Sequence, residues 1–296
     1  MKKESFDEKV GWGRMLLVGF QHVLTMCPGT IAVPLILAGA LGLNEKETAF
    51  LVSANFFTSG IAILIQVLGI GKLAGSRYPI VLGSSFAPLS PMILIGKEYG
   101  MAALFGSVIA SGAVIFLLSF FMDKILKLFP QVVVGTFVTL IGITLAPTAL
   151  RDLVGGEGNA GFGSVENLIL GLAVLIFILL VEKYGKGIWK SMSLLLGITA
   201  GTAAGCFLHM VDIASIAQAE IFQPVQPFAY GVPEFKLWPI FLMTIFCIIN
   251  MIQCIGVFSV MDEIADVETE NEIKERGIRG QAVAQMITGA FNSVHL

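Results

Sequence analysis

Two groups of polar residues within apolar stretches have the chemistry to bind a polar solute. Gln21 and His22 lie in one run without charged residues, and Asn250 and Gln253 lie three apart in another. Residues three apart share a helix face, and Gly256, three further on, opens that face. Polar side chains inside a membrane commonly mark a substrate pathway. They also join neighbouring helices, and the residues alone leave both uses open.

A third feature is a segment that cannot form a continuous helix. Residues 78–96 read YPIVLGSSFAPLSPMILIG and contain three prolines as well as Gly83. A proline in a helix interior removes a hydrogen bond and costs about 3 kcal/mol. We therefore expect residues 80–86 to be extended, with a half-helix after them. Broken spans form the binding sites of many transporters, where backbone groups contact the substrate. A proline-kinked helix buried in the bundle is the alternative.

The elements that position these residues are predicted to be membrane spans. Apolar residues make up 56% of the 296-residue chain and charged residues only 13%, whereas a soluble domain carries roughly 25% charge. This composition predicts an all-α polytopic membrane protein. The net charge of −3 leaves no basic surface for a nucleic acid. No metalloprotease, nucleophile-elbow or phosphate-loop motif is present, so we expect neither an enzyme nor a bound cofactor.

Nine stretches lack charged residues, and most reach the roughly 20 residues that a helix needs to cross a membrane. They cover residues 15–44, 48–71, 78–96, 99–122, 128–150, 167–181, 191–211, 237–261 and 281–296. Within the seventh, Gly197, Gly201 and Gly205 predict close packing against another helix. Asn55 and Gln66 of the second are interpreted as contacts between helices.

The positions of lysine and arginine predict the orientation of the spans. With residues 1–14 in the cytoplasm, 14 of the 18 basic residues lie inside. The four outside are Lys46, Lys97, Arg151 and Lys236. An excess of positive charge inside is the usual arrangement. The loops 151–166 and 212–236 are therefore expected outside the cell membrane, and the loop 262–280 is expected in the cytoplasm.

Four motifs, spread from the first span to the ninth, together resemble one transporter family. They are Gln21 to Gly29 (QHVLTMCPG) with Val33-Pro34, Gly83 to Ala87 (GSSFA) with Ser90-Pro91, Phe129-Pro130 with Val134-Gly135 and Ile141-Gly142, and residues 277–293. The chain resembles the nucleobase–ascorbate transporter family, and within it the bacterial xanthine and uric acid permeases. The Gln-His pair and the GSSF segment are the most specific of these motifs.

The resemblance implies a fold of two inverted seven-helix repeats with a core domain and a gate domain. Residues 15–211 correspond to the first repeat, whose spans one to four belong to the core and five to seven to the gate. An outward loop, 212–236, leads to residues 237–296, which correspond to spans eight and nine. Short antiparallel strands in the broken spans three and ten meet at the substrate. The second repeat is incomplete in this chain.

The resemblance also implies the residues that bind substrate. They are Gln21, His22, Gly29, Ser85, Phe86, Gln253 and Gly256. A purine would pack its face against the Phe86 ring, while backbone groups contact its edge. Gln253 stands where the family carries a glutamate, so it can still form hydrogen bonds but cannot titrate. The coupling ion, H⁺ or Na⁺, stays open.

The resulting expectation is secondary-active transport of a purine nucleobase by alternating access. Its partners would be the purine, the lipid bilayer and, at full length, a second copy of the chain. An anion permease of the same architecture is one alternative, and a truncated membrane protein without transport activity is another. Because the family's tenth-span motif lies beyond residue 296, we expect residues 1–296 alone not to transport.

The predicted topology can be tested with single cysteines and a membrane-impermeant thiol reagent applied to intact cells. Gly158→Cys should be labelled because it lies outside, and Glu270→Cys should react only after the cells are made permeable. Labelling of position 270 but not of position 158 in intact cells would invert the topology.

Overall fold

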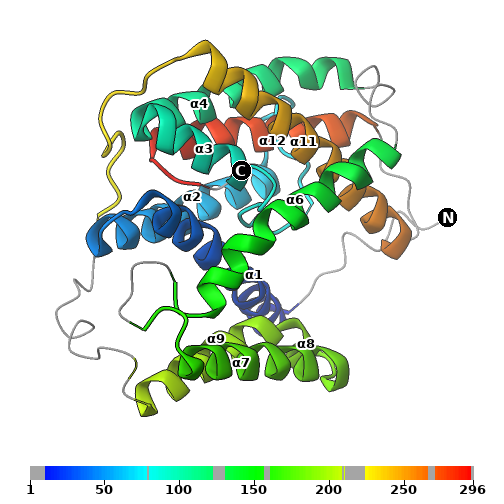
Figure 1. Cartoon of the computed structure of the whole chain (residues 1–296). Coiled ribbons are helices and arrows are strands. Elements are labelled where there is room, and N and C mark those ends of the chain that lie inside the picture. The colour runs from blue at the N-terminus through cyan, green and yellow to red at the C-terminus, as the bar shows by residue number, and fades with distance from the viewer. Residues whose placement is uncertain are drawn as a thin grey trace. The chain divides into compact units, whose positions relative to one another are not determined.

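The regular structure in the computed structural model is helical throughout the described part of the chain. The structure describes residues 11–78, 80–122, 131–156, 161–208, 210, 224–265 and 271–294. The helices are α1 (Trp12–Leu41), α2 (Glu45–Leu68), α3 (Leu89–Tyr99), α4 (Met101–Leu118), η1 (Ser119–Phe121), α6 (Gln131–Leu153), α7 (Val165–Tyr184), α8 (Ile188–Ser191), α9 (Ser193–Phe207), α11 (Leu237–Ala265) and α12 (Asn271–Ala290) (Figure 1).

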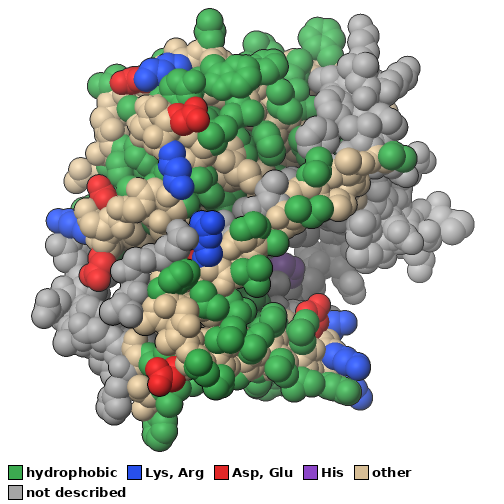
Figure 2. Space-filling view, viewed as in Figure 1, with side chains coloured by type: hydrophobic (Ala, Val, Ile, Leu, Met, Phe, Trp, Pro, Cys, Tyr) green, Lys and Arg blue, Asp and Glu red, His purple; other side chains and the backbone are tan. Residues whose placement is uncertain are grey.

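Five of the described helices are long and apolar enough to cross a membrane. The qualifying segments are Gly19–Leu41, Glu45–Leu68, Met101–Phe121, Val165–Tyr184 and Leu237–Phe258. Figure 2 shows hydrophobic side chains over much of the visible described surface, with few charged ones among them. Apolar faces of this extent suit a lipid environment, because a soluble monomer rarely exposes them.

Several predictions fall wholly or partly outside the described residues. They are the segment 1–14 up to residue 10, the motif Phe129-Pro130, residues 157–160 of the loop 151–166, the first part of the loop 212–236 and residues 266–270 of the loop 262–280.

Contacts divide the chain into two units. The first contains Gly29–Ile143 and Val225–Leu296, and the second contains Gly11–Pro28 and Thr144–Pro224. In the second unit α7 packs against α9. A Cβ atom added to Gly197 would clash with Ile178, and one added to Gly201 would lie 2.9 Å from Val174 Cγ2. The predicted close packing at these two glycines is confirmed.

In the first unit α12 packs against α4, α11 and α2, as Figure 1 shows for the first two. Polar bonds hold this packing. The Gln285 amide donates hydrogen bonds to Ser111 Oγ (2.8 Å) and to the carbonyl of Val108 (3.2 Å), joining α12 to α4. A further bond reaches Cys247 Sγ at 3.2 Å on α11. Each bond satisfies a polar group that neither lipid nor an apolar core could pair.

The segment before α11 lies against the ends of α2, α4 and α12. Phe228 N donates to the carbonyl of Ala290, and Glu234 N donates to that of Ala102. The Tyr230 ring stacks on Phe105, with centroids 5.7 Å apart. Burial, with a smaller contribution from the Glu47 carboxylate, raises the pKa of the Tyr230 phenol.

Close approach of α4 and α12 predicts opposite effects for two glycine-to-alanine changes. A Cβ at Gly289 would lie 2.5 Å from Ile109 Cγ1 and 3.1 Å from the carbonyl oxygen of Phe105, whereas one at Gly60 meets nothing within 4 Å. Gly289→Ala should therefore cost about 1–3 kcal/mol through overpacking. Gly60→Ala should leave stability unchanged or raise it by up to about 1 kcal/mol, because alanine is the better helix former.

Thermal unfolding of the purified protein in detergent, followed by size-exclusion chromatography, checks this prediction. Both variants make the same glycine-to-alanine change within a helix, so a large difference between them reports the contact at Gly289. Equal melting temperatures for the two variants would mean that α4 and α12 do not pack as described.

Candidate functional site

The broken span is the centre of the candidate site. Residues Ile80–Ser85 adopt no helix, and α3 begins only at Leu89, directly after its N-cap residue Pro88. A fixed proline φ and a missing N–H suit the start of a helix and oppose its interior. The predicted break with a half-helix after it is confirmed. No strand is assigned to Ile80–Ser85, and the β-bridge within the described residues joins Ile70 and Ala74.

A single buried amide holds this segment in place. Asn55 of α2 is fully buried. Its Nδ2 donates to Ser84 Oγ and to the carbonyl of Thr30 on α1, both at 2.7 Å. Its Oδ1 accepts a hydrogen bond of 3.1 Å from Ser293 Oγ. The prediction that Asn55 joins helices is confirmed, and the same side chain also positions the GSSF segment.

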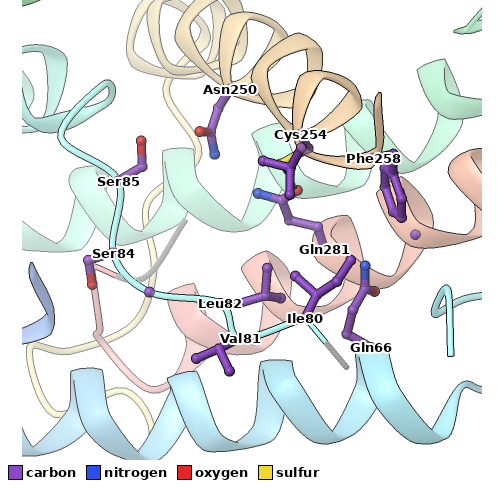
Figure 3. Close-up of a pocket in the computed structure, with 13 residues that line it drawn as sticks. Gln66, Ile80, Val81, Leu82, Ser84, Ser85, Asn250, Cys254, Phe258 and Gln281 are labelled. Atoms are coloured by element: carbon purple, nitrogen blue, oxygen red, sulfur yellow. Dashed lines mark hydrogen bonds between the residues drawn. The ribbon is translucent and has the colours of Figure 1, made fainter. Parts of the chain in front are cut away.

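One face of the segment borders a cavity of about 280 Å³. This volume is near the lower end of the roughly 300–1,000 Å³ typical of small-molecule sites. The thirteen lining residues are Gln66, Ile80, Val81, Leu82, Gly83, Ser84, Ser85, Asn250, Cys254, Val257, Phe258, Gly277 and Gln281 (Figure 3). None of them carries a charge at neutral pH. The cavity therefore combines apolar walls with neutral polar groups.

Three of the lining side chains carry a carboxamide, namely Gln66, Asn250 and Gln281. Figure 3 shows Asn250 on α11 and Gln281 on α12 directed toward the broken segment. The thiol of Cys254 donates a 2.7 Å hydrogen bond to Gln281 Oε1. This bond holds the oxygen of Gln281 against α11, so its Nε2 is the atom left for the cavity. Gln66 on α2 is 3% exposed and forms part of the same wall.

An aromatic ring closes one side of the cavity. Phe258 on α11 is 2% exposed, and its ring lies against Gly277 of α12. A Cβ at Gly277 would sit 2.5 Å from Phe258 Cζ, so only glycine admits the ring at this position. Tyr78 lies on another side of the ring, with centroids 6.3 Å apart. The ring is therefore held in place as a flat apolar surface.

The structure brings some of the sequence-predicted residues to this cavity. Ser85 lines it, and the Ser85 hydroxyl accepts a hydrogen bond from Ala87 N. Phe86 follows with 40% of its surface exposed and is not one of the lining residues. At Gly29 an added Cβ would be 3.9 Å from the carbonyl oxygen of Ser84. The first span therefore approaches the segment closely at a small residue.

The other predicted residues lie beside or away from the cavity lining. Gln253 and Gly256 are on α11, but the lining residues of that helix are Asn250, Cys254, Val257 and Phe258. Gln21 and His22 are on α1 in the second contact unit. The roles of these four residues stay predictions.

Sequence reasoning did not select Gln281, Cys254 or Phe258, and it interpreted Gln66 only as a helix contact. A signal was present in the spacing. Asn250, Cys254 and Phe258 follow at intervals of four, which places them on one helix face. The sequence analysis instead selected Gln253, whose amide lies three residues after Asn250 on the adjacent face.

A solved structure shares the fold. The transmembrane domain of a cyanobacterium bicarbonate transporter matches with a TM-score of 0.60 at 19% sequence identity, covering 93% of this chain and 72% of that one. This likeness, together with the five apolar helices, confirms the predicted all-α polytopic membrane fold.

Curated relatives are closer in sequence. A nucleobase transporter of Paenibacillus larvae is 42% identical over 95% of this chain, and the xanthine permease of Bacillus subtilis is 40% identical over 96%. A uric acid transporter of Escherichia coli is 35% identical over 98%. The chain spans 64% of the length of the first two relatives and 61% of the third.

These relatives confirm the resemblance that the motifs indicated. The family model described as the Permease family matches residues 13–295, and the chain therefore belongs to that family.

Proposed function

We propose that this chain belongs to a transporter that carries a purine nucleobase of the xanthine and uric acid type across the cell membrane. The observation that carries the proposal is the uncharged cavity beside the broken span, which combines three carboxamides with a flat aromatic wall. Relatives named xanthine permease, uric acid permease and nucleobase transporter support the same substrate class.

A purine nucleobase suits this cavity for physical reasons. Its two faces are apolar and flat, so one of them can pack against the Phe258 ring. Its edge alternates N–H donors with carbonyl and ring-nitrogen acceptors. Each carboxamide offers donors and an acceptor side by side, so Asn250 and Gln281 can pair with such an edge. The polar backbone of Ile80–Ser85 supplies further partners.

Transport would proceed by alternating access, with a core that carries the site past a gate. The division into two contact units supports this arrangement, because the first unit contains the cavity and the second contains α7 to α9. In this proposal the N-terminus is cytoplasmic, the gate mediates a homodimer, and a gradient of H⁺ or Na⁺ drives uptake. Gln21, His22, Gly29, Ser85, Phe86, Gln253 and Gly256 are proposed to contact the substrate or border its path.

The anion-permease alternative has less support at the cavity. An inorganic anion loses strong hydration on binding, and that loss must be offset by cations or several N–H donors. No lysine, arginine or histidine is among the residues that line the cavity. The likeness to the bicarbonate transporter domain concerns the fold alone, since site chemistry differs among proteins that share a fold.

Two matched asparagine variants test the site. Asn250 is 8% exposed and lines the cavity, whereas Asn271 is exposed at the start of α12. Asn250→Leu should leave polar atoms of a bound purine unpaired, at a cost of about 1–3 kcal/mol. The affinity for radiolabelled xanthine or uric acid should therefore fall roughly tenfold or more. Asn271→Leu should bind like the parent protein.

The assay is scintillation proximity with the purified protein in detergent, with excess bicarbonate added as a competitor. Bicarbonate should not displace the purine. Displacement by bicarbonate would favour the anion permease, and failure of the parent to bind any purine would favour a protein without transport function.

The predicted residues beside the cavity can be tested in the same assay. Phe86→Ala should weaken purine binding by removing a stacking surface, and Gln253→Ala by removing a hydrogen-bonding partner. Both variants must elute as the parent does in size-exclusion chromatography. Parent-like affinity in both would remove these two residues from the proposed site.

A further inference from the structure

The pair formed by Cys254 and Gln281 fixes which end of a carboxamide faces the cavity. A glutamine amide has a donor end and an acceptor end of nearly the same shape, so its neighbours decide which end points where. The thiol of Cys254 on α11 donates a 2.7 Å hydrogen bond to Gln281 Oε1 on α12. Because sulfur accepts only weakly, a flipped amide would lose this bond and place an N–H against the sulfur. The thiol therefore favours one orientation of the amide.

In that orientation the donor end of Gln281 faces the cavity. Cys254 and Gln281 both line it. Figure 3 shows the nitrogen of Gln281 on the side of the broken segment and the oxygen beside Cys254. Among the described residues the thiol is the hydrogen-bond partner of this carboxamide, and it occupies the oxygen. Both protons on Nε2 therefore remain for a ligand.

Contacts on either side of Gln281 fix the helix that carries it. Five positions earlier, the carbonyl of Arg276 accepts a 2.7 Å hydrogen bond from Gly75 N, which lies in the turn after α2. Four positions later, the amide of Gln285 donates to Ser111 Oγ at 2.8 Å on α4. The backbone under the cavity-facing amide is therefore held on both sides, and the thiol restricts the remaining rotation of the amide.

Two serines of the broken segment offer donors as well. Ser84 Oγ accepts a hydrogen bond from Asn55 Nδ2 at 2.7 Å, and Ser85 Oγ accepts one from Ala87 N at 3.2 Å. Each hydroxyl keeps its own proton, which it can donate to a ligand. Asn250 adds one carboxamide with both a donor and an acceptor. These lining side chains together favour a ligand whose edge is rich in acceptors.

We propose that Gln281 is a specificity-determining residue that donates through Nε2 to a carbonyl oxygen of the bound heterocycle, and that Cys254 is a positioning residue that sets this polarity. The inference rests on the proposed function and refines its substrate class. The site selects purines with a carbonyl at the contacted position over purines with an amino group there. Two facing N–H donors leave each other unpaired, which is costly in a buried site. The two kinds of purine have nearly the same shape, so size does not separate them.

Two analogues of xanthine test its two carbonyls one at a time. Guanine has an amino group in place of one carbonyl, and isoguanine has an amino group in place of the other, each with the accompanying loss of a ring proton. Their affinities are measured by competition against radiolabelled xanthine on the purified protein, at a mildly acidic pH where all three ligands are neutral. At least one analogue should bind roughly tenfold or more weakly than xanthine, because its amino group faces the Gln281 donor.

Variants of Cys254 separate amide orientation from side-chain volume. In Cys254→Ala the amide can flip and present its oxygen, so the preference for xanthine over that analogue should shrink to about threefold or less. Cys254→Ser restores a donor at nearly the volume of alanine and should retain the parent's preference. Serine and alanine variants with the same preference would mean that the thiol only fills space, and would overturn its positioning role.

A variant of Gln281 provides an independent test of the donor. Gln281→Met removes the amide, keeps an unbranched chain and should shrink the same preference, mainly by weakening xanthine binding. Cys247→Ala is the matched control, because Cys247 is a buried cysteine of the same helix that donates to Ser111 Oγ at 3.7 Å and does not line the cavity. It should leave the preference unchanged. Each variant must elute as the parent does in size-exclusion chromatography, and if one of the two sites fails to fold, the other decides.

The outcomes distinguish the inference from the proposed function. Xanthine binding by the parent with both analogues bound equally well, or the parent's preference retained in Gln281→Met, would overturn the role of Gln281 and leave the proposed function standing. Absence of purine binding by the parent protein would overturn both.

Discussion

The candidate site depends on one constraint. The buried backbone of the broken span forms no helix, so its polar groups need hydrogen-bond partners from elsewhere. In a membrane, irregular backbone survives only where protein groups or a polar cavity satisfy it. The Asn55 side chain provides some of these hydrogen bonds. Its three hydrogen bonds join α1, the GSSF segment and Ser293 through one side chain. Removal of that amide would break these three hydrogen bonds at once and would weaken the hold of α2 on each of the three elements.

Much of this architecture could be predicted from the sequence because its causes are local. Prolines around residues 79–91 interrupt a helix wherever they occur, and glycines four apart mark a helix contact. The start of α12 was harder to predict from the sequence. The charge-free stretch begins at residue 281, yet the helix begins at Asn271. Absence of charge marks the part of a helix that lipid surrounds. It does not mark the helix end, because Arg276 and Arg279 find protein partners in the carbonyl of Gly71 and the ring of Phe120.

The far wall of the cavity could not be predicted, since it depends on tertiary contacts. Gln66 and Gln281 are more than 200 positions apart, and no periodicity connects them. Their environments differ, because Cys254 donates a hydrogen bond to the oxygen of Gln281 while the buried oxygen of Gln66 has no donor among the described residues. A glutamine whose oxygen has a donor and a glutamine whose oxygen has none look alike in a sequence. Only the packing of α2, α11 and α12 distinguishes them.

The mixed lining of the cavity has a consequence for the solvent. Serine, asparagine and glutamine groups stand beside isoleucine, valine and phenylalanine in the same small volume. Polar groups of this kind attract water, while the apolar wall gives that water few bonds in return. A solute that reproduces the polar bonds and covers the apolar wall would release such poorly held water to the bulk. Binding should then reduce the heat capacity of the system, as burial of apolar surface does. The apolar wall would thus determine how affinity changes with temperature.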